Sequence, residues 1–195
     1  MKKVFIITIL ALLSACAQAP EAFKAGPLAF EREQGVTRLS VNEIRVVNHY
    51  QSPMKRPNVE QEFPVAPASA VSTWVSKRLR ATPGSNQGIL EVTIHDASVV
   101  EQALPKTEGF KGLITDDQDA RYTAKLVVSF KHYPQGSTAA NATGDVTVSR
   151  SRTINERATV SEREAIFHQM TNALMTDFDR EANSRLRQYF VAYIR

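Results

Sequence analysis

The sequence predicts an α+β domain in which two helices cover one face of a four-stranded, mainly antiparallel sheet. Three observations support this class. Alternating apolar and polar residues mark the strands, apolar residues at i, i+3 and i+4 mark two helices, and the elements follow the order β-α-β-β-β-α. The chain has 195 residues, which suits one domain with a buried core.

The clearest strand covers residues 121–131, where the even-numbered positions are apolar and most odd-numbered positions are polar. Residues 90–95 alternate in the same way, and a further strand spans residues 142–154. Such alternation is typical of an antiparallel sheet with one face buried and the other in water. The first strand candidate, residues 37–50, changes phase near residues 42–43, which predicts a bulge there.

The first helix is expected to begin at Pro67. Proline has no backbone N–H, and at the first helical position an N–H would have no hydrogen-bond partner within the helix, so nothing is lost there. It is expected to end before Pro83 and Gly84, which stop a helix. Its apolar stripe consists of Val71, Trp74, Val75 and Leu79.

The second helix is expected to begin at Ser161, because Ser161-x-x-Glu164 matches a capping box. Apolar residues continue at helical spacing towards Tyr193, and an unbroken helix of this length would measure about 50 Å. A small sheet cannot cover that length, so the sequence predicts a kink near Asn183 and Ser184 or an exposed end. The first part of its apolar stripe comprises Phe167, Met170, Leu174 and Phe178.

The N-terminus has the layout of a secretory signal, with basic residues at 2–3, an apolar run over 4–13 and small residues before Cys16, the single cysteine. The run is shorter than the roughly 20 residues that span a bilayer. Leu13-Ser14-Ala15-Cys16 resembles the lipobox of bacterial lipoproteins. The resemblance implies cleavage before Cys16, acylation of its thiol and anchorage in a membrane through the attached lipid. The alternative is an incidental thiol behind a plain signal peptide.

On this basis residues 1–15 form the signal peptide, residues 16–36 a lipidated tether, and residues 37–195 a single periplasmic domain. The tether contains prolines and small residues without a sustained period. Enterobacterial lipoproteins kept in the inner membrane tend to carry an aspartate after the cysteine. This chain has Ala17 there, so the resemblance implies the outer membrane, on its periplasmic side. Three apolar residues of the tether are candidates for packing on the domain: Phe23, Leu28 and Phe30.

The order of elements resembles that of several small envelope lipoproteins, among them the lipopolysaccharide-assembly lipoprotein LptE and the auxiliary lipoproteins of ABC-type transport systems. The resemblance is one of topology and implies a non-enzymatic accessory or scaffold of an envelope system for lipid or lipopolysaccharide transport or assembly, with a protein partner. The alternative is a lipoprotein that binds a lipid or glycan without a protein partner. That alternative predicts an apolar cavity of several hundred cubic ångströms between helices and sheet.

No catalytic, metal or cofactor site stands out, so the sequence predicts a non-enzymatic protein. The acidic cluster at residues 116–119 lacks the glycine and terminal glutamate of an EF-hand loop, which favours a solvated loop over a calcium site. A hydrolase would need a histidine and carboxylates that converge in a cleft. Without Lys2 and Lys3 the basic and acidic residues number 22 and 20, a balance that does not indicate a nucleic-acid partner. Four histidines stand at spacings that match no metal motif: His49, His95, His132 and His168.

Two groups of residues are candidates for contact with a partner or ligand. Arg150 and Arg152 share a face of their strand, and three basic residues share a face of the strand at 121–131. If these faces coincide, a basic stripe suits an anionic lipid or glycan; the alternative is a charged face that keeps the sheet soluble. The second group either packs on the core or forms an apolar tip that docks on a partner or lipid. It consists of Phe110, Leu113 and Ile114.

Overall fold

The structure is a computed structural model, and it describes residues 22–33, 35–82, 88–105, 118–155 and 157–195. The predicted α+β class is confirmed. Along the chain the elements are α1 (Ala29–Arg32), β1 (Thr37–Leu39), β2 (Glu43–Asn48), the 3-10 helix η1 (Glu60–Glu62), α2 (Pro67–Arg78), β3 (Leu79–Ala81), β4 (Ile89–Asp96), β5 (Val99–Ala103), β6 (Gln118–Tyr133), β7 (Ala142–Asn155), α3 (Val160–Tyr189) and the 3-10 helix η2 (Val191–Tyr193).

The main sheet is built around β6. β7 pairs antiparallel with one edge of β6 along almost its whole length. β4 and β5 share the other edge, with β4 opposite residues 127–133 and β5 opposite residues 120–124. β2 extends the sheet as a parallel neighbour of β4. The main sheet therefore has five strands and not the predicted four, because β5, in a segment to which the sequence assigned no strand, shares one edge of β6 with β4.

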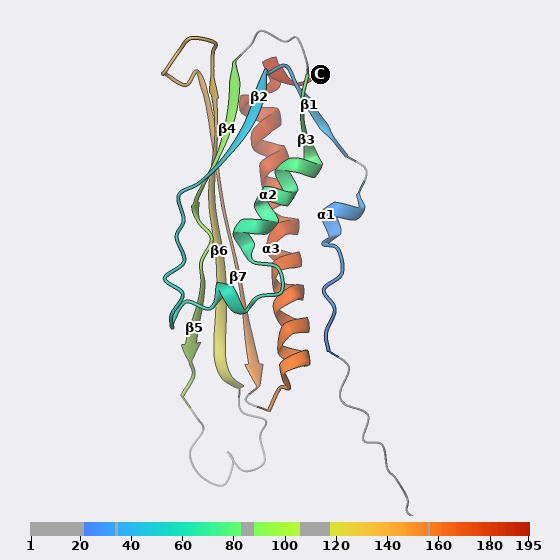
Figure 1. Ribbon diagram of the computed structural model, residues 1–195, viewed down its shortest axis with the longest axis vertical. Coiled ribbons are helices and arrows are strands. Elements are labelled where there is room, and N and C mark those ends of the chain that lie inside the picture. The colour runs from blue at the N-terminus through green and yellow to red at the C-terminus, as the bar shows by residue number, and fades with distance from the viewer. Residues whose placement is uncertain (1–21, 34, 83–87, 106–117, 156) are drawn as a thin grey trace, which may run out of the picture.

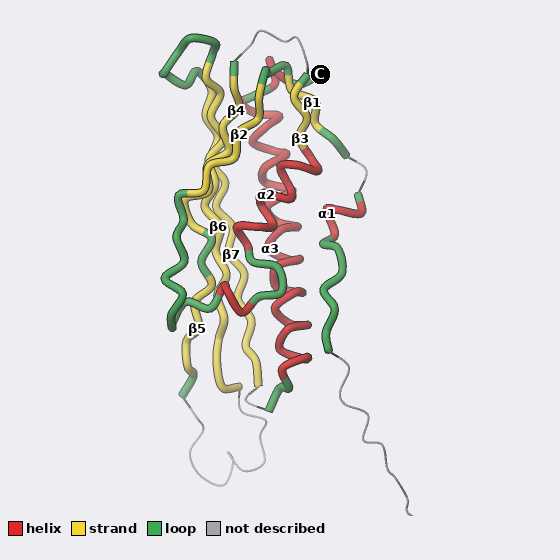
Figure 2. Tube along the Cα trace, viewed as in Figure 1, coloured by secondary structure: helices red, strands yellow, loops and turns green. Residues whose placement is uncertain are grey.

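Both long helices pack on one face of this sheet, and α3 runs parallel to the long strands β6 and β7 (Figures 1 and 2). The 30 residues of α3 make it about 45 Å long. The 14 residues of β7 span about 46 Å, so the sheet covers the whole helix. The expectation of a kink near Asn183 and Ser184 is therefore wrong, because it assumed a shorter sheet.

The capping box of α3 lies two residues before the expected one. Thr159 is the N-cap: its Oγ1 accepts a hydrogen bond from the Glu162 backbone N–H at 3.2 Å, and a Glu162 carboxylate oxygen accepts one from the Thr159 N–H at 2.8 Å. The expectation that Ser161 caps the helix is thus wrong. Two overlapping motifs, Thr159-x-x-Glu162 and Ser161-x-x-Glu164, satisfy the same rule, and the helix begins at the earlier one.

The core between helices and sheet is filled by aromatic and aliphatic side chains. Trp74 on α2 packs edge-to-face against Phe178 on α3 and Phe130 on β6, with ring centroids 5.1 and 6.2 Å apart, and all three are fully buried. The α3 stripe and the α2 residues Val71, Trp74 and Val75 are buried, which confirms the helical periodicity. The expectation that the first helix continues almost to Pro83 is wrong, because α2 ends at Arg78 and Leu79 is buried in strand β3.

The expected first strand is divided between two sheets. β1 pairs in parallel with β3, and β2 pairs with β4, so the phase change marks the end of one strand and the start of another. The expectation of a bulge there is wrong. The C-terminal residues bind to the end of β1. Ile194 forms a β-bridge with Leu39, and the Ser40 N–H donates a hydrogen bond to the Tyr193 carbonyl at 2.7 Å.

The segment before β1 packs on α3. Leu28 and Phe30 are buried, which confirms that expectation, and the Ala29 N–H donates to the Asn172 side chain at 2.6 Å. His168 Nε2 lies 2.7 Å from the Gly26 carbonyl oxygen, and its ring contacts Phe23. The packed body therefore includes residues on the N-terminal side of residue 37.

The first and the last described residues lie at opposite ends of an elongated body. In Figure 1 the blue N-terminal segment starts at the lower end, where β7 ends and α3 begins, while the C-terminus lies at the upper end. β5 ends and β6 begins at the lower end as well (Figure 1).

Candidate functional site

Four of the predicted functional residues lie outside the described residues: Cys16, Phe110, Leu113 and Ile114. The described residues next to them, however, have defined positions. The described chain begins at the lower end of the body, where β5 ends and β6 begins (Figure 1).

Arg150 and Arg152 lie on the helix-facing side of β7. Arg150 Nε lies 2.5 Å from an Asp177 carboxylate oxygen on α3, and Arg180 lies 3.0 Å from the other oxygen. Hydrogen bonding to Arg150 is the main cause that lowers the pKa of the Asp177 carboxyl. Arg152 Nη1 donates to the Gln169 side chain at 3.0 Å. Both arginines therefore bond α3 across the edge of the sheet.

The register of β6 and β7 separates the two predicted basic groups. Arg150 pairs with Ala124, whose side chain faces the core, whereas Lys125 pairs with Ser149 on the open face. Directly paired residues of an antiparallel sheet lie on the same face. The continuous stripe that would join Arg150 and Arg152 with Arg121, Lys125 and Lys131 is therefore not formed. On the open face, Lys125 lies 3.1 Å from Asp96.

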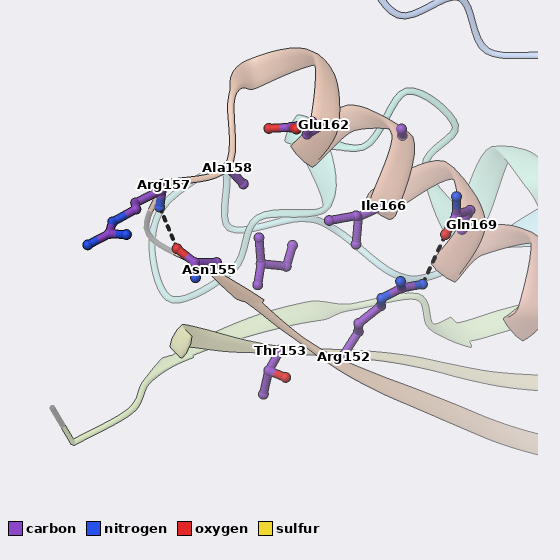
Figure 3. A pocket seen from close by; sticks show the side chains of 10 residues that line it. Arg152, Thr153, Asn155, Arg157, Ala158, Glu162, Ile166 and Gln169 are labelled. Carbon is purple, nitrogen blue, oxygen red and sulfur yellow. Dashed lines mark hydrogen bonds between the residues drawn. The ribbon is translucent and has the colours of Figure 1, made fainter. Parts of the chain in front are cut away.

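An open groove of about 730 Å3 lies at the lower end of the body, between the end of β7 and the first turns of α3 (Figure 3). Arg152 reaches across it to Gln169, and the Asn155 side chain accepts a hydrogen bond from the Arg157 N–H at 2.8 Å. Ile154 and Ile166 supply an apolar part of the lining. The groove combines guanidinium and amide groups with an apolar floor, a composition suited to a polar group with an aliphatic attachment.

A smaller pocket, which the sequence did not indicate, lies where β2 ends, α2 begins and β4 gives way to β5. Its volume is about 260 Å3, and Ala66, Ala68 and Ala97 provide the walls. Glu60 on η1 lies in the lining and is only 4% exposed. Three small side chains thus leave a space beside a buried carboxylate. We call this the Glu60 pocket, and its remaining lining residues are Asn48, Tyr50, Ser52, Met54 and Gln61.

Neutral donors hold the Glu60 carboxylate. Tyr50 donates its hydroxyl to Oε1 at 2.5 Å, the Val99 N–H donates to Oε2 at 3.2 Å, and Ser52 also bonds the carboxylate. Burial raises the pKa of the Glu60 carboxyl, but these hydrogen bonds outweigh burial and lower it, so the group is ionised at neutral pH. Burial and the bond to Glu60 raise the pKa of Tyr50, which keeps its hydroxyl protonated.

The histidines do not gather into a metal site: in the part of the chain that the structure describes, no three His, Cys, Asp or Glu residues could hold a metal ion together. His95 Nε2 lies 2.8 Å from Ser129 Oγ on the open face of the sheet, and the His49 ring is 6.0 Å away. No carboxylate of residues 22–33, 35–82, 88–105, 120–155 or 157–195 bonds His95. The contact therefore satisfies the buried hydroxyl of Ser129 without the third group of a catalytic triad.

Among the described residues, no helix has both the length and the apolar character needed to cross a membrane. Of the acidic cluster, Asp116 and Asp117 lie outside those residues.

No family model matches the chain, and no curated protein matches it in sequence. Its fold is similar to that of several solved structures. A minor lipoprotein from Acinetobacter baumannii is 9% identical with a TM-score of 0.39, and the alignment covers 76% of this chain and 93% of that one. Rare lipoprotein B from Shewanella oneidensis is 12% identical with a TM-score of 0.35, covering 75% and 98%.

A protein of the family DUF330 from Xanthomonas campestris is 8% identical with a TM-score of 0.37, and the alignment covers 86% of this chain and 92% of that one. All three TM-scores lie below 0.5, so these likenesses establish neither a family nor an activity for this chain.

Proposed function

We propose that the protein is a lipid-anchored lipoprotein of the bacterial outer membrane that faces the periplasm. It acts without catalysis as an accessory or scaffold for a protein partner in an envelope system for lipid or lipopolysaccharide transport or assembly. The observation that carries the proposal is the order of basic residues, apolar run and Leu13-Ser14-Ala15-Cys16 at the N-terminus. The thiol of Cys16 is the acylated atom, because a thiolate is a strong nucleophile among side chains.

The entry point of the chain supports an end-on arrangement at the membrane. Gly26 and Ala29 are held on α3 by His168 and Asn172, and the first described residues of the chain lie at the lower end of the body (Figure 1). An anchor at Cys16 turns that end towards the lipid. The proposed contact residues are Phe110, Leu113 and Ile114, outside the described residues, for a partner or lipid, and Arg152 in the groove for an anionic group.

Core packing favours the scaffold over a lipid- or glycan-binding protein that lacks a protein partner. That alternative requires an apolar cavity between helices and sheet, whereas Trp74, Phe130 and Phe178 fill this layer and are fully buried. The groove in Figure 3 and the Glu60 pocket lie at the ends of strands.

The test is Cys16→Ser in the full chain, expressed in a bacterium with labelled palmitate. The wild type is expected to incorporate the label and to sediment with outer membranes, and the variant is expected to do neither. Ser14→Ala, which keeps the thiol, is the control and should behave as the wild type. A Cys16→Ser protein that still sediments with membranes, together with a wild type that takes up no palmitate, would overturn the proposal. Purification of the wild type in detergent should recover envelope transport or assembly proteins, whereas a monomer that carries only a bound glycolipid would contradict the scaffold.

A further inference from the structure

We propose that the Glu60 pocket binds the side-chain ammonium of a lysine on a partner protein. The inference rests on the proposed accessory function, since it assigns a place and a chemistry to the contact with a partner.

The first step is a negative charge that has no cation beside it. Glu60 is 4% exposed and ionised, and the groups that bond it are neutral: the hydroxyls of Tyr50 and Ser52 and the backbone N–H groups of Val99 and of Glu60 itself. In the portion of the chain that the structure describes, no lysine, arginine or histidine forms an ion pair with it. The nearby Arg56 instead pairs with Glu62 and Glu101. The neutral donors keep Glu60 ionised but do not neutralise it, so its negative charge attracts a cation that enters the pocket.

The second step is the shape of the space beside the carboxylate. A volume of about 260 Å3 equals roughly nine water molecules, which is enough for the five non-hydrogen atoms of an aminobutyl group. The methyl groups of Ala66, Ala68 and Ala97 offer an apolar wall to four methylene groups. The Glu60 carboxylate in the lining supplies the negative charge that the ammonium complements.

The remaining polar groups of the pocket suit an ammonium better than a guanidinium. A guanidinium is planar and binds a carboxylate best through two parallel hydrogen bonds, whereas Tyr50 and Val99 already bond one Glu60 oxygen each. An ammonium is a compact donor that can share its other two protons with neutral acceptors, and Asn48 and Gln61 are among the lining residues.

The rim carries a backbone conformation that a methionine rarely adopts. Met54 has a φ of 54°, lies 67% exposed at the pocket, and its N–H donates to Ser52 Oγ at 3.1 Å. Since Ser52 also bonds Glu60, the carboxylate holds the rim that presents Met54 to solvent. Strained backbone is concentrated at binding sites, and an exposed methionine adapts to the surface of a partner.

A lipid ethanolamine is the other source of a primary ammonium, and the pocket favours lysine over it. Ethanolamine has two methylene groups and then an anionic phosphate, which would lie close to the Glu60 carboxylate. Lysine has four methylene groups for the alanine wall and no negative charge.

The test titrates the full chain, purified in detergent, with N-acetyl-lysine amide and follows the NMR signals of the alanine methyl groups. We expect saturable shifts at Ala66, Ala68 and Ala97 with a dissociation constant in the millimolar range, and binding weaker by about tenfold or more in Glu60→Gln. N-acetyl-norleucine amide, which lacks the charge, should bind at least about tenfold more weakly than the lysine amide. Glu62→Gln, on the same 3-10 helix but outside the pocket, is the matched control and should bind as the wild type.

A second variant separates binding from the structural role of the carboxylate. Ala68→Leu fills the space and leaves Glu60 unchanged, so it should abolish the shifts, while Ser69→Leu on the exposed side of the helix should not. The inference is overturned if the wild type shows no saturable shifts, if Glu60→Gln or Ala68→Leu binds as tightly as the wild type, or if norleucine amide or O-phosphoethanolamine binds as well as the lysine amide. These results do not depend on acylation, so a failure here is distinct from a failure of Cys16→Ser.

Discussion

The packing of α3 on the sheet can be tested by removing one aromatic ring from the core. Phe178 is fully buried, with its ring 5.1 Å from Trp74 and 6.4 Å from Phe130. Substitution by alanine removes the ring that fills the space between the two helices and β6. The surrounding side chains belong to three different elements, so they cannot all shift to close the resulting cavity.

The expected cost follows from this burial. Phe178→Ala should lower the free energy of unfolding by about 3–5 kcal/mol, which includes lost transfer energy, the cavity and the edge-to-face contact with Trp74. With a urea m-value of about 2 kcal/mol/M, the midpoint should fall by about 2 M. Because domains are typically stable by about 5–15 kcal/mol, the variant should still fold.

Trp74 is the single tryptophan, so its fluorescence reports the unfolding of this core. The assay is urea denaturation of the full chain in detergent, followed by tryptophan emission. Tyr189→Ala is the control, because Tyr189 lies on the same helix but is 44% exposed, and it should cost less than about 0.5 kcal/mol. Equal midpoints for the two variants would refute the packing described here. They would favour the alternative in which helices and sheet enclose a ligand cavity.

Two further substitutions test the attachment and the start of α3. Arg150 lowers the pKa of Asp177 in the folded protein. The pair should therefore contribute its full stabilisation above pH 3.8, the ordinary pKa of an aspartate. This stabilisation should be lost as the pH falls from 3.8 through the lower pKa of the folded state. The difference in free energy of unfolding between wild type and Asp177→Asn, measured by urea denaturation, should therefore shrink from pH 7 to pH 2.5, and a difference independent of pH would contradict the pairing. Thr159→Ala should cost about 1 kcal/mol through loss of the N-cap, and Ser161→Ala clearly less. If Ser161→Ala lowered the melting temperature more than Thr159→Ala, Ser161 and not Thr159 would be the N-cap.

Local periodicity accounts for the elements that the sequence predicted well. The stripe of α2 and the alternation of β6 each follow from residues close together in the chain, and each is buried as expected. The length of the sheet that α3 covers was underestimated, because that length depends on how separate strands pair. The 16 residues of β6 and the 14 of β7 give α3 a surface that neither strand shows alone.

The sequence contained enough information to predict that Arg150 and Arg152 lie on the core-facing side of β7. Val146, Val148 and Ile154 have the same parity as both arginines, and a strand places residues of one parity on one face. The buried valines therefore put the arginines on the core side, whereas Lys125 has the opposite parity to the core residues of β6. The apolar residues of both strands carried enough information to reject a shared basic face.

The Glu60 pocket had no comparable signal. It joins a proline-rich loop to β5, and its central bonds connect Glu60 with residues 10 and 39 positions away in the chain. No periodicity relates such positions, and the alanines that create the space are common in any sequence. Only the folded chain brings a buried carboxylate and an apolar wall together.

The docked N-terminal segment limits how far the proposed anchor lets the body move. His168 holds Gly26, ten residues after Cys16, and ten residues span at most about 36 Å when fully extended. A free tether of 21 residues (16–36) would reach roughly twice as far. If Cys16 carries the proposed lipid, this shorter reach keeps the Glu60 pocket nearer the membrane and raises the effective concentration of a membrane-bound partner. Weak recognition of a single lysine would then suffice for docking.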